Sequence, residues 1–408
     1  MAGWTRRFRF AIAAILGAAA AAPSGGSELK LERVAMLMRH GIRPPTKAQP
    51  IPEQYSSRAW PQWSVGPGLL TPHGAKGAAL LAAVDRAHFA KRGLLPASAC
   101  PATGQISVTA SKVPRAIATA EAWVNGFAPG CGLTVNYPSK DQPDALFHPL
   151  QEQPAWFDGR RAFQDALTRA PKGGVMAEAR HLARPTRRLE QILGCVRPAC
   201  DLEHSISRLV ERPHDRPSIH GPLSVAATAS ETFLLEYLEN MPMADVGWGL
   251  VSRAEIERLL VFTAVKFHYE DRPPVVARAT AGPLAKAIVD ALSAPYGPPI
   301  TLLAGHDTNI ADLGGLLDLH WRVPSYPRDT VPPGSALGFE LLSDSAGKRY
   351  VRAFFRSQSM SQLRNLEPLS TANPPYRGYV DIPGCGRAAD ARSCDLLTFA
   401  KLVEAKLQ

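Results

Sequence analysis

Apolar runs that alternate with helical stretches predict an α/β protein. Residues 32–38 form a mostly apolar run of strand length, and Thr71-Pro72 is a favourable start for a helix over about residues 73–92. A short strand at 108–110 is followed by a second helical stretch that begins at Pro114. Strands that alternate with helices in this way indicate an α/β core.

The pattern changes in the middle of the chain and then returns. Helical periodicity with little strand signal runs from about residue 151 to 270, and strand-like runs then resume. We therefore expect an α/β domain from residues 29–150 and 271–408, interrupted by an α-helical insertion domain at 151–270. The expected helices are 159–170, 176–193, 224–240 and 252–268, the later strands are 300–304, 338–342 and 350–356, and the Pro-rich segment 322–335 is expected to be a loop.

The first 22 residues are typical of a secretory signal peptide. Residues 1–22 contain the cationic sequence Arg6-Arg7-Phe8-Arg9, then an apolar run, then small residues. The apolar run has about 12 residues and is too short to span a bilayer. We therefore expect a periplasmic or secreted protein with no membrane attachment after cleavage. Lys and Arg outnumber Asp and Glu by 46 to 36, and an excess remains without the leader, which favours anionic ligands.

Composition and cysteine content fit a disulfide-bonded globular protein. The 408 residues are 45% hydrophobic and 20% charged, which excludes a disordered adaptor. Six cysteines in an exported chain indicate disulfides, although the sequence alone allows many pairings. A zinc site is the alternative, but no Cys-x-x-Cys pair or His-x-x-x-His cluster is present. Proximity favours the pairs Cys100–Cys131, Cys195–Cys200 and Cys385–Cys394.

The clearest chemical signal lies directly after the first expected strand, where the chain reads Arg39-His40-Gly41-Ile42-Arg43-Pro44. Ligands of open α/β sheets bind at the carboxyl ends of strands. Two arginines beside a histidine can hold an oxyanion by charge-assisted hydrogen bonds while the imidazole faces its central atom. A basic surface loop is the alternative, and the spacing and the strand context favour the anion site.

A second signal follows the strand at 300–304. His306-Asp307 precedes a helix expected over 309–317, so the pair lies at the same kind of position as the first motif. The histidine can donate one more hydrogen bond to an anion, and the aspartate can supply a proton. Asp307 or Thr308 would also serve as the N-cap of that helix. Its pairing with the first motif favours a shared active site.

The two motifs together resemble those of the histidine acid phosphatases. The resemblance is closest to the bacterial periplasmic branch that contains phytase/acid phosphatases and glucose-1-phosphatases. It runs from about Leu29 to the C-terminus and rests on RHGxRxP at 39–44, on His306-Asp307, on Arg115 and on the positions of the cysteines. The resemblance implies a phosphoglycerate-mutase-like α/β core with a mixed sheet, plus an inserted, mainly α-helical domain.

The resemblance also implies a role for each motif residue. His40 would be the nucleophile that forms a phosphohistidine, and Asp307 would protonate the leaving alcohol. The groups that bind the phosphate oxygens would be Arg39, Arg43, Arg115 and His306. Because arginines supply the positive charge, no metal or cofactor is implied. Since guanidinium groups lower the pKa of His40 while Asp307 must be protonated to act, we expect an acidic pH optimum.

Three further residues are candidates for recognising the rest of the substrate. Phytases of this branch resemble the chain in having Gly41 and Thr46-Lys47, whereas glucose-1-phosphatases usually have Asn in place of that glycine. Lys47 would hold a second phosphate, or would point into solvent as most lysines do. Glu231 matches an acidic residue that lines the phytase pocket, although a solvated helix face would also place a glutamate there.

The chain departs from the family pattern at two positions. An acidic residue is common where this chain has Pro114, and phytases often have a pocket arginine where this chain has Thr280. Arg278 would have to compensate for that missing charge. Phytate is therefore the expected substrate, with glucose 1-phosphate or a broad range of small phosphomonoesters as the alternative.

Three other classes are less compatible with these features. A phosphoglycerate-mutase-like enzyme shares the Arg-His-Gly core, but such enzymes are typically cytosolic and lack the helical insertion. An inactive polyanion-binding protein would not need both His40 and Asp307, which are present. A nucleic-acid-binding protein is disfavoured, because the sequence contains no recognised motif of that class and no interleaved aromatic and basic residues. We expect a monomer whose partner is a small phosphomonoester.

Overall fold

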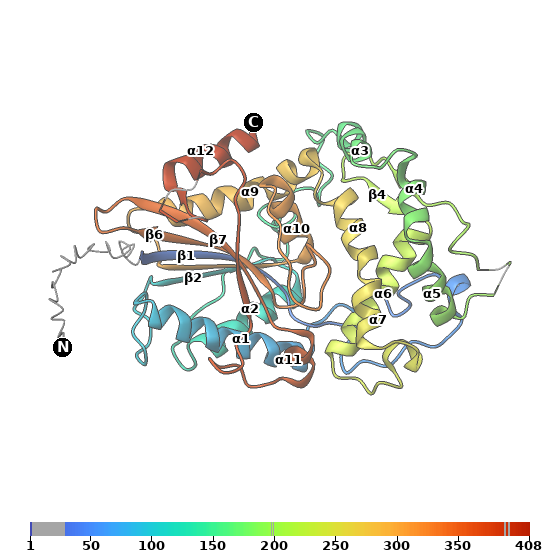
Figure 1. The fold of residues 1–408 in the computed structure, drawn as a ribbon, viewed down its shortest axis with the longest axis horizontal. Coiled ribbons are helices and arrows are strands. Elements are labelled where there is room, and N and C mark those ends of the chain that lie inside the picture. The colour runs from blue at the N-terminus through green and yellow to red at the C-terminus, as the bar shows by residue number, and fades with distance from the viewer. Residues whose placement is uncertain (2–28, 197, 199, 387–388, 391) are drawn as a thin grey trace.

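A mixed β-sheet with helices on both faces forms one part of the molecule, and further helices lie beyond one end of the sheet (Figure 1). The computed structural model describes residues 1, 29–196, 198, 200–386, 389–390 and 392–408. The α/β fold class with a mixed sheet is confirmed. The expected signal peptide, residues 1–22, falls almost entirely outside the described residues.

The sheet combines parallel and antiparallel strands in the spatial order β2-β5-β1-β6-β7-β8, with β9 beside β7. β1 and β2 both pair in parallel with β5, and all the other pairs in this sheet are antiparallel. The strands are β1 (Lys30–Arg39), β2 (Ile106–Ala110), β5 (Ile300–Gly305), β6 (Ala336–Ser343), β7 (Arg349–Ser357), β8 (Tyr376–Val380) and β9 (Cys394–Asp395). The predicted strands 32–38, 108–110, 300–304, 338–342 and 350–356 are therefore all present, each slightly longer than expected.

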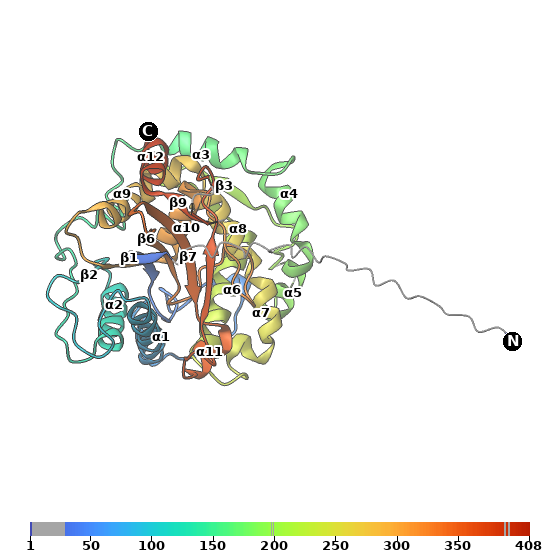
Figure 2. The same ribbon diagram turned by 60° about the vertical axis from the view of Figure 1, so that its left-hand side comes forward.

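Helices cover both faces of the sheet (Figures 1 and 2). α1 (Pro72–Lys91) and α2 (Pro114–Phe127) pack together on one face. The other face carries α9 (Pro274–Ser293), α10 (Asp307–Leu316) and α12 (Leu396–Leu407). The Thr71 side chain caps α1 by accepting a hydrogen bond from Gly74 N–H, as the sequence signal predicted.

The central strand β1 is buried on both faces. Met36 and Met38 pack with residues of α1 and α2, whereas Ala35 and Leu37 belong to the core on the opposite face. Successive side chains of a strand point to opposite sides, so a run that is apolar at every position fits a strand covered on both sides. This burial fixes the register of β1 and thus the position of the residues that follow it.

The segment between α2 and α9 is mainly helical but contains a short β-hairpin that the sequence did not predict. Its strands are β3 (Arg208–Val210) and β4 (Ser218–His220). The helical elements are α3 (Gly159–Thr168), α4 (Gly174–His181), α5 (Ala183–Leu193), α6 (Pro222–Leu238), the 3-10 turn η2 (Val246–Gly249), α7 (Arg253–Leu259) and α8 (Val261–Glu270). Two short elements lie elsewhere, the 3-10 turn η1 (Glu53–Tyr55) and α11 (Met360–Asn365).

Three helix predictions need correction. The expected helix 176–193 is broken at Leu182, where Pro185 lacks the N–H that would bond to residue 181. The expected helix 252–268 is interrupted at Leu260, which keeps near-helical angles (φ −62°, ψ −9°). The helix expected at 309 begins at Asp307, so its N-cap is His306 rather than Asp307 or Thr308.

The three disulfides that chain proximity favoured are all present. They join Cys100 to Cys131, Cys195 to Cys200 and Cys385 to Cys394. Each one closes a short loop, with sequence separations of 31, 5 and 9 residues. Among the described residues, no helix is both long and apolar enough to cross a membrane.

We predict that Leu37→Ala destabilises the protein by about 2–5 kcal/mol, because it leaves a cavity under the central strand. The measurement is urea unfolding followed by circular dichroism. Leu397→Ala is the matched control, because Leu397 on α12 is 72% exposed and should cost little. Equal destabilisation by the two substitutions would contradict the burial of β1.

Candidate active site

Three strands end at the same edge of the sheet, and each is followed by a polar side chain. β1, β5 and β2 run parallel, and Arg39 lies opposite Gly305 in the register. His40 follows β1, His306 follows β5 and Ser111 follows β2. The His40 and His306 ring centroids are 5.5 Å apart. The two sequence motifs therefore meet, as their positions after parallel strands predicted.

His40 is held in a single orientation with one ring nitrogen free. Its backbone N–H donates to Gly305 O at 3.0 Å, and its backbone carbonyl accepts from Gly334 N–H at 3.0 Å. The ring Nδ1 lies 2.8 Å from the carbonyl oxygen of Gly41, which can only accept, so Nδ1 carries the proton. The lone pair is thus on Nε2.

Gly41 is required where the loop after β1 meets the start of α1. A Cβ at Gly41 would lie 2.8 Å from the carbonyl oxygen of Gly74, and a Cβ at Gly74 would lie 2.5 Å from the backbone N of Ile42. The Gly41 N–H also donates to Thr119 Oγ1 at 3.0 Å. The loop after His40 is therefore fixed by direct backbone packing.

Three arginines surround His40. Arg39 is the last residue of β1, and Arg43 comes from the loop that follows it. Arg115 comes from the first turn of α2, where Pro114 occupies the favourable first helical position. The Nε–H groups of all three arginines are buried without a hydrogen-bond partner among the described residues. Buried N–H groups are normally paired, so three of them around one imidazole suit an anion with several acceptor oxygens.

The surroundings keep His40 neutral. Burial, followed by the charges of Arg43 and Arg39, lowers the pKa of His40 well below its usual value. The sequence analysis also expected a lowered pKa for His40, but burial contributes more to the lowering than the arginines do. Burial and the charge of Arg43 lower the pKa of Arg115 to about 10, so this side chain remains a cation in acid.

His306 belongs to a chain of hydrogen bonds whose other members the sequence analysis missed. Arg115 Nη2 donates to His306 Nδ1 at 3.3 Å, so His306 Nε2 carries the proton and donates to Ser111 Oγ at 3.2 Å. Ser111 donates in turn to Asp144 at 2.6 Å. The His148 ring packs at a tilt against His306, with centroids 4.7 Å apart and an interplanar angle of 42°. The position of Ser111 directly after β2 was an available signal.

Asp307 lies in the first turn of α10 and faces the arginines. Its Oδ2 atom is 3.0 Å from Arg39 Nη2. Burial raises the pKa of Asp307, but the charges of Arg39 and Arg43 outweigh burial and lower that pKa to about 2. Asp307 is therefore an anion when it faces only these guanidinium groups. A bound phosphate dianion would offset their charge and raise the pKa of Asp307.

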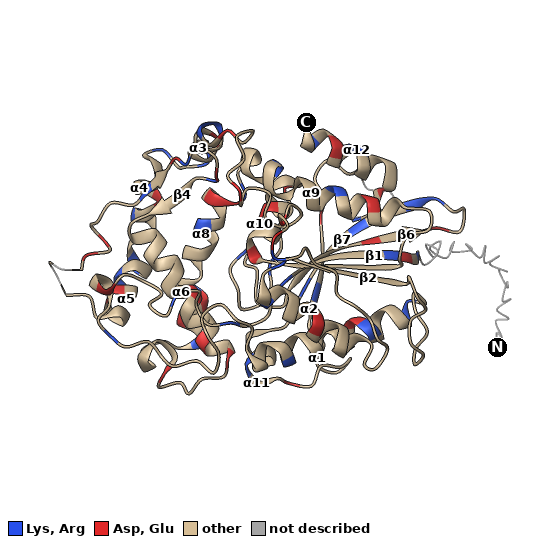
Figure 3. Cartoon of the chain, turned by 180° about the vertical axis from the view of Figure 1, so that it is seen from behind, with Lys and Arg blue, Asp and Glu red and all other residues tan. Residues whose placement is uncertain are grey.

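The guanidinium group of Arg39 is fully buried, and acidic side chains from two other helices balance its positive charge. It pairs with Glu231 of α6 as well as with Asp307, and it donates to the carbonyl oxygen of Val331. Acidic positions on α6 and α10 lie among basic ones in this region (Figure 3). Glu231 is thus an ion-pair partner at the active site, and the alternative of a solvated helix face is wrong.

The residues expected to recognise the substrate line one pocket of about 410 Å³. Thr46 and Lys47 lie at its exposed rim, and Glu231 and Asp307 line its interior. Thr280 is buried and donates to Val276 O at 2.9 Å. Arg278 is not among the described residues that line the pocket, whereas Lys266 of α8, which the sequence analysis overlooked, is.

Comparison with known proteins agrees with this geometry. The model of the histidine phosphatase superfamily (branch 2) matches residues 30–169 and 271–356. Phytase AppA of Escherichia coli K12 is 34% identical, with 92% of each chain covered. Glucose-1-phosphatase of Salmonella typhimurium LT2 is 30% identical, covering 91% of this chain and 92% of that protein.

Solved structures of phytases are also similar. The Citrobacter braakii phytase gives a TM-score of 0.86 at 34% identity, covering 92% of this chain and 98% of that one. The Hafnia alvei phytase in complex with myo-inositol hexakis sulphate gives a TM-score of 0.86 at 30% identity, covering 95% and 98%. This chain therefore belongs to branch 2 of the histidine phosphatase superfamily.

Proposed function

We propose that the protein is an acid phosphatase that hydrolyses phosphomonoesters through a phosphohistidine on His40. The observation that carries this proposal is the free Nε2 of a neutral, buried imidazole at the centre of three guanidinium groups. A phosphate group bound by Arg39, Arg43 and Arg115 would present its phosphorus to that nitrogen. His306 would join them by exchanging its hydrogen bond with Arg115 or Ser111 for one to a phosphate oxygen. The arginines supply the positive charge that stabilises the transition state, so the proposed reaction needs no metal ion.

The proposed reaction has two steps. In the first, the lone pair of His40 Nε2 forms a bond to phosphorus, the phosphorus–oxygen ester bond breaks, and Asp307 gives its proton to the departing alcohol oxygen. In the second, water attacks the phosphohistidine, Asp307 takes a proton from that water, and the phosphorus–nitrogen bond breaks. Inorganic phosphate leaves, and both residues return to their starting protonation states.

The substrate proposed is phytate, and glucose 1-phosphate is the second candidate. The chain is similar to phytases and to glucose-1-phosphatases, but the phytase is the more similar sequence. Gly41 supports the phytase assignment, because the phytases of this branch resemble the chain in having a glycine there whereas glucose-1-phosphatases usually have asparagine. Thr46, Lys47 and Glu231 at the pocket would contact the rest of the substrate. An inactive polyanion-binding protein is the alternative of another class.

The cellular setting is proposed as the periplasm or the extracellular medium, with the protein acting as a monomer. Three disulfides support an oxidising compartment, because thiols stay reduced in the cytosol. The catalytic residues all come from one chain, so the site is complete without a second copy.

We expect His40→Ala to lower kcat at least about 10³-fold, because the covalent route is lost. The measurement is phosphate release at about pH 5 from phytate, glucose 1-phosphate and p-nitrophenyl phosphate, with EDTA present. The kcat/KM values of the wild type for the same three substrates show which of them is preferred. Near-wild-type rates in a folded His40→Ala protein would refute the nucleophile, and absence of turnover by the wild type would favour the inactive binder.

Asp307→Asn should slow cleavage of glucose 1-phosphate about 10²-fold, because a sugar oxygen leaves poorly without a proton. The effect on p-nitrophenyl phosphate should be much smaller, because p-nitrophenolate is a stable leaving group. The ratio of the two kcat/KM values checks this. Equal losses for both substrates would assign Asp307 to phosphate binding or charge balance instead of proton transfer.

We expect the pH profile of kcat to peak below pH 7. The low pKa of His40 keeps the nucleophile neutral in acid, whereas the rate falls as rising pH removes the proton from Asp307 in the substrate complex. The profile is measured with glucose 1-phosphate under saturating conditions. A maximum above pH 7 would contradict these two roles.

A further inference from the structure

Behind His306, a chain of hydrogen bonds runs into the interior and ends at a carboxylate that the proposed reaction does not use. His306 Nε2–H donates to Ser111 Oγ at 3.2 Å, and the Ser111 hydroxyl donates to Asp144 Oδ2 at 2.6 Å. The Lys112 N–H donates to the same carboxylate oxygen at 3.2 Å. His306, Ser111 and Asp144 are all buried. The chain therefore connects the candidate phosphate site to a buried negative charge.

The carboxylate of Asp144 lacks a cationic partner in this arrangement. Its hydrogen-bond partners among the described residues are the Ser111 hydroxyl and the Lys112 N–H, both uncharged donors. Its Oδ1 atom is buried without a hydrogen-bond partner in the same part of the chain. A buried charge is normally balanced by a nearby opposite charge. A positive charge on the His306 ring, one hydroxyl away, would balance Asp144.

The orientation of the His306 ring is fixed from several sides. Asn309, in the first turn of α10, accepts a hydrogen bond from the His306 backbone N–H at 2.9 Å and donates to Phe147 O at 2.7 Å. The neighbouring His148 ring packs against the His306 ring. These contacts tie the loop before α3 to the start of α10, and they hold the imidazole with Nδ1 toward Arg115.

The direction of the hydrogen bonds leaves a neutral His306 without an N–H for a phosphate oxygen. Asp144 takes the one hydrogen of the Ser111 hydroxyl, so Ser111 Oγ accepts from His306 Nε2–H. The lone pair on Nδ1 accepts from Arg115 Nη2 at 3.3 Å. Burial, followed by the charge of Arg115, lowers the pKa of His306 well below its usual value. His306 must therefore gain a proton on Nδ1 before it can donate to phosphate.

A bound phosphomonoester can supply both the proton and the charge that His306 needs. Below about pH 6 such an ester is a monoanion that still carries one acidic proton. Transfer of this proton to Nδ1 breaks the phosphate O–H bond, forms the N–H bond and leaves a phosphate dianion beside an imidazolium. The titratable and charged groups that face this imidazolium are Arg115 of α2, His40 and Arg43 after β1, Asp307 of α10, and Asp144 and His148 of the loop before α3.

We propose that Ser111 and Asp144 are positioning residues that hold His306 by its Nε2–H, so that Nδ1 takes the acidic proton of a phosphomonoester monoanion and donates a hydrogen bond to the resulting dianion. This inference rests on the proposed function and deepens it, because it states that His306 gives up its bond with Arg115 and keeps its bond with Ser111. The proton leaves again with the product, inorganic phosphate monoanion. The site thereby favours the protonated form of its substrate.

The first test observes the ring nitrogens directly. The protein is labelled with ¹⁵N-histidine and followed by NMR while inorganic phosphate is added at about pH 5, and His306→Gln assigns the signals. On binding, Nδ1 of His306 should become protonated while Nε2 keeps its proton. Bound phosphate with Nδ1 unprotonated, or with Nε2 deprotonated, would overturn the proposal. Because no turnover is needed, this result decides the inference even if the wild type hydrolyses no ester and the proposed function fails.

The second test compares kcat/KM for glucose 1-phosphate at about pH 5 and pH 7. Ser111→Ala removes the link to the carboxylate and Asp144→Asn removes its charge, so each should lower kcat/KM about tenfold at pH 5. The loss at pH 7 should be much smaller, because the substrate is then already a dianion. Ser111→Thr keeps the hydroxyl and should retain the wild-type profile. Equal losses at both pH values would assign the two residues to stability alone and overturn the proposal.

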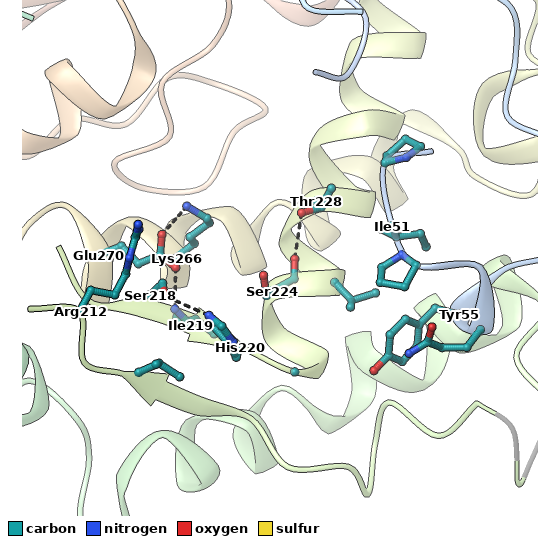
Figure 4. Close-up of a pocket in the computed structure, with 16 residues that line it drawn as sticks. Ile51, Tyr55, Arg212, Ser218, Ile219, His220, Ser224, Thr228, Lys266 and Glu270 are labelled. Atoms are coloured by element: carbon teal, nitrogen blue, oxygen red, sulfur yellow. Dashed lines mark hydrogen bonds and ion pairs between the residues drawn. The ribbon is translucent and has the colours of Figure 1, made fainter. Parts of the chain in front are cut away.

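Matched controls come from the same kinds of contact elsewhere in the chain. The His220 ring Nε2 lies 3.0 Å from Ser218 Oγ in a neighbouring cavity of about 760 Å³ (Figure 4), so Ser218→Ala removes a serine–histidine contact away from His306. Asp344, in the turn between β6 and β7, accepts from the Tyr350 hydroxyl at 2.7 Å, so Asp344→Asn removes a similar acceptor. Neither control should change the pH dependence, and a change as large as that in Asp144→Asn would count against the proposal. If Ser111→Ala or Asp144→Asn does not fold, as judged by thermal unfolding, the NMR measurement on the wild type still decides.

Discussion

Mutual repulsion among three guanidinium groups around one buried imidazole is the constraint on which the rest of the structure depends. Burial is the largest penalty on Arg43 and Arg115 as cations, and the charge of Arg39 adds to that penalty for both. The protein offsets this with Asp307 from α10 and Glu231 from α6, both paired with Arg39. Substrate phosphate would complete the balance. The helical segment between α2 and α9 therefore contributes to the candidate active site itself, because α6 supplies the carboxylate of Glu231 that pairs with Arg39.

Much of this arrangement could be predicted from the sequence because parallel strands bring their carboxyl ends to one edge. The motifs after residues 32–38 and 300–304 were expected to meet, and they do. Continuous apolar runs identified β1 and β5, which are buried on both faces. The two broken helices were harder, because the apolar periodicity continues through Leu182 and Leu260. Pro185 was an available signal for the first break, whereas the second depends on backbone geometry at Leu260.

The residues that were missed share one property: their importance comes from contacts across the fold. Ser111, Asp144 and His148 bear on His306 only once β2 lies beside β5. Lys266 reads as an ordinary helical i,i+4 partner of Glu270, and only the packing of α8 against α6 places it at the pocket. Glu231 was identified through the family resemblance, and its pairing with fully buried Arg39 shows why a helix surface carries an acid there.

The pairing of β1 with β5 and β6 determines how much of the chain must be made before the candidate active site can form. His40 lies near the start of the described chain, whereas the strands on either side of β1 begin at Ile300 and Ala336. A partly synthesised chain has arginines and a histidine but no sheet to align them and no Asp307. Long-range pairing of this kind is slow to form. The candidate active site can therefore assemble only after most of the polypeptide has been made, so an unfinished chain does not yet hold together the groups that the proposed reaction needs.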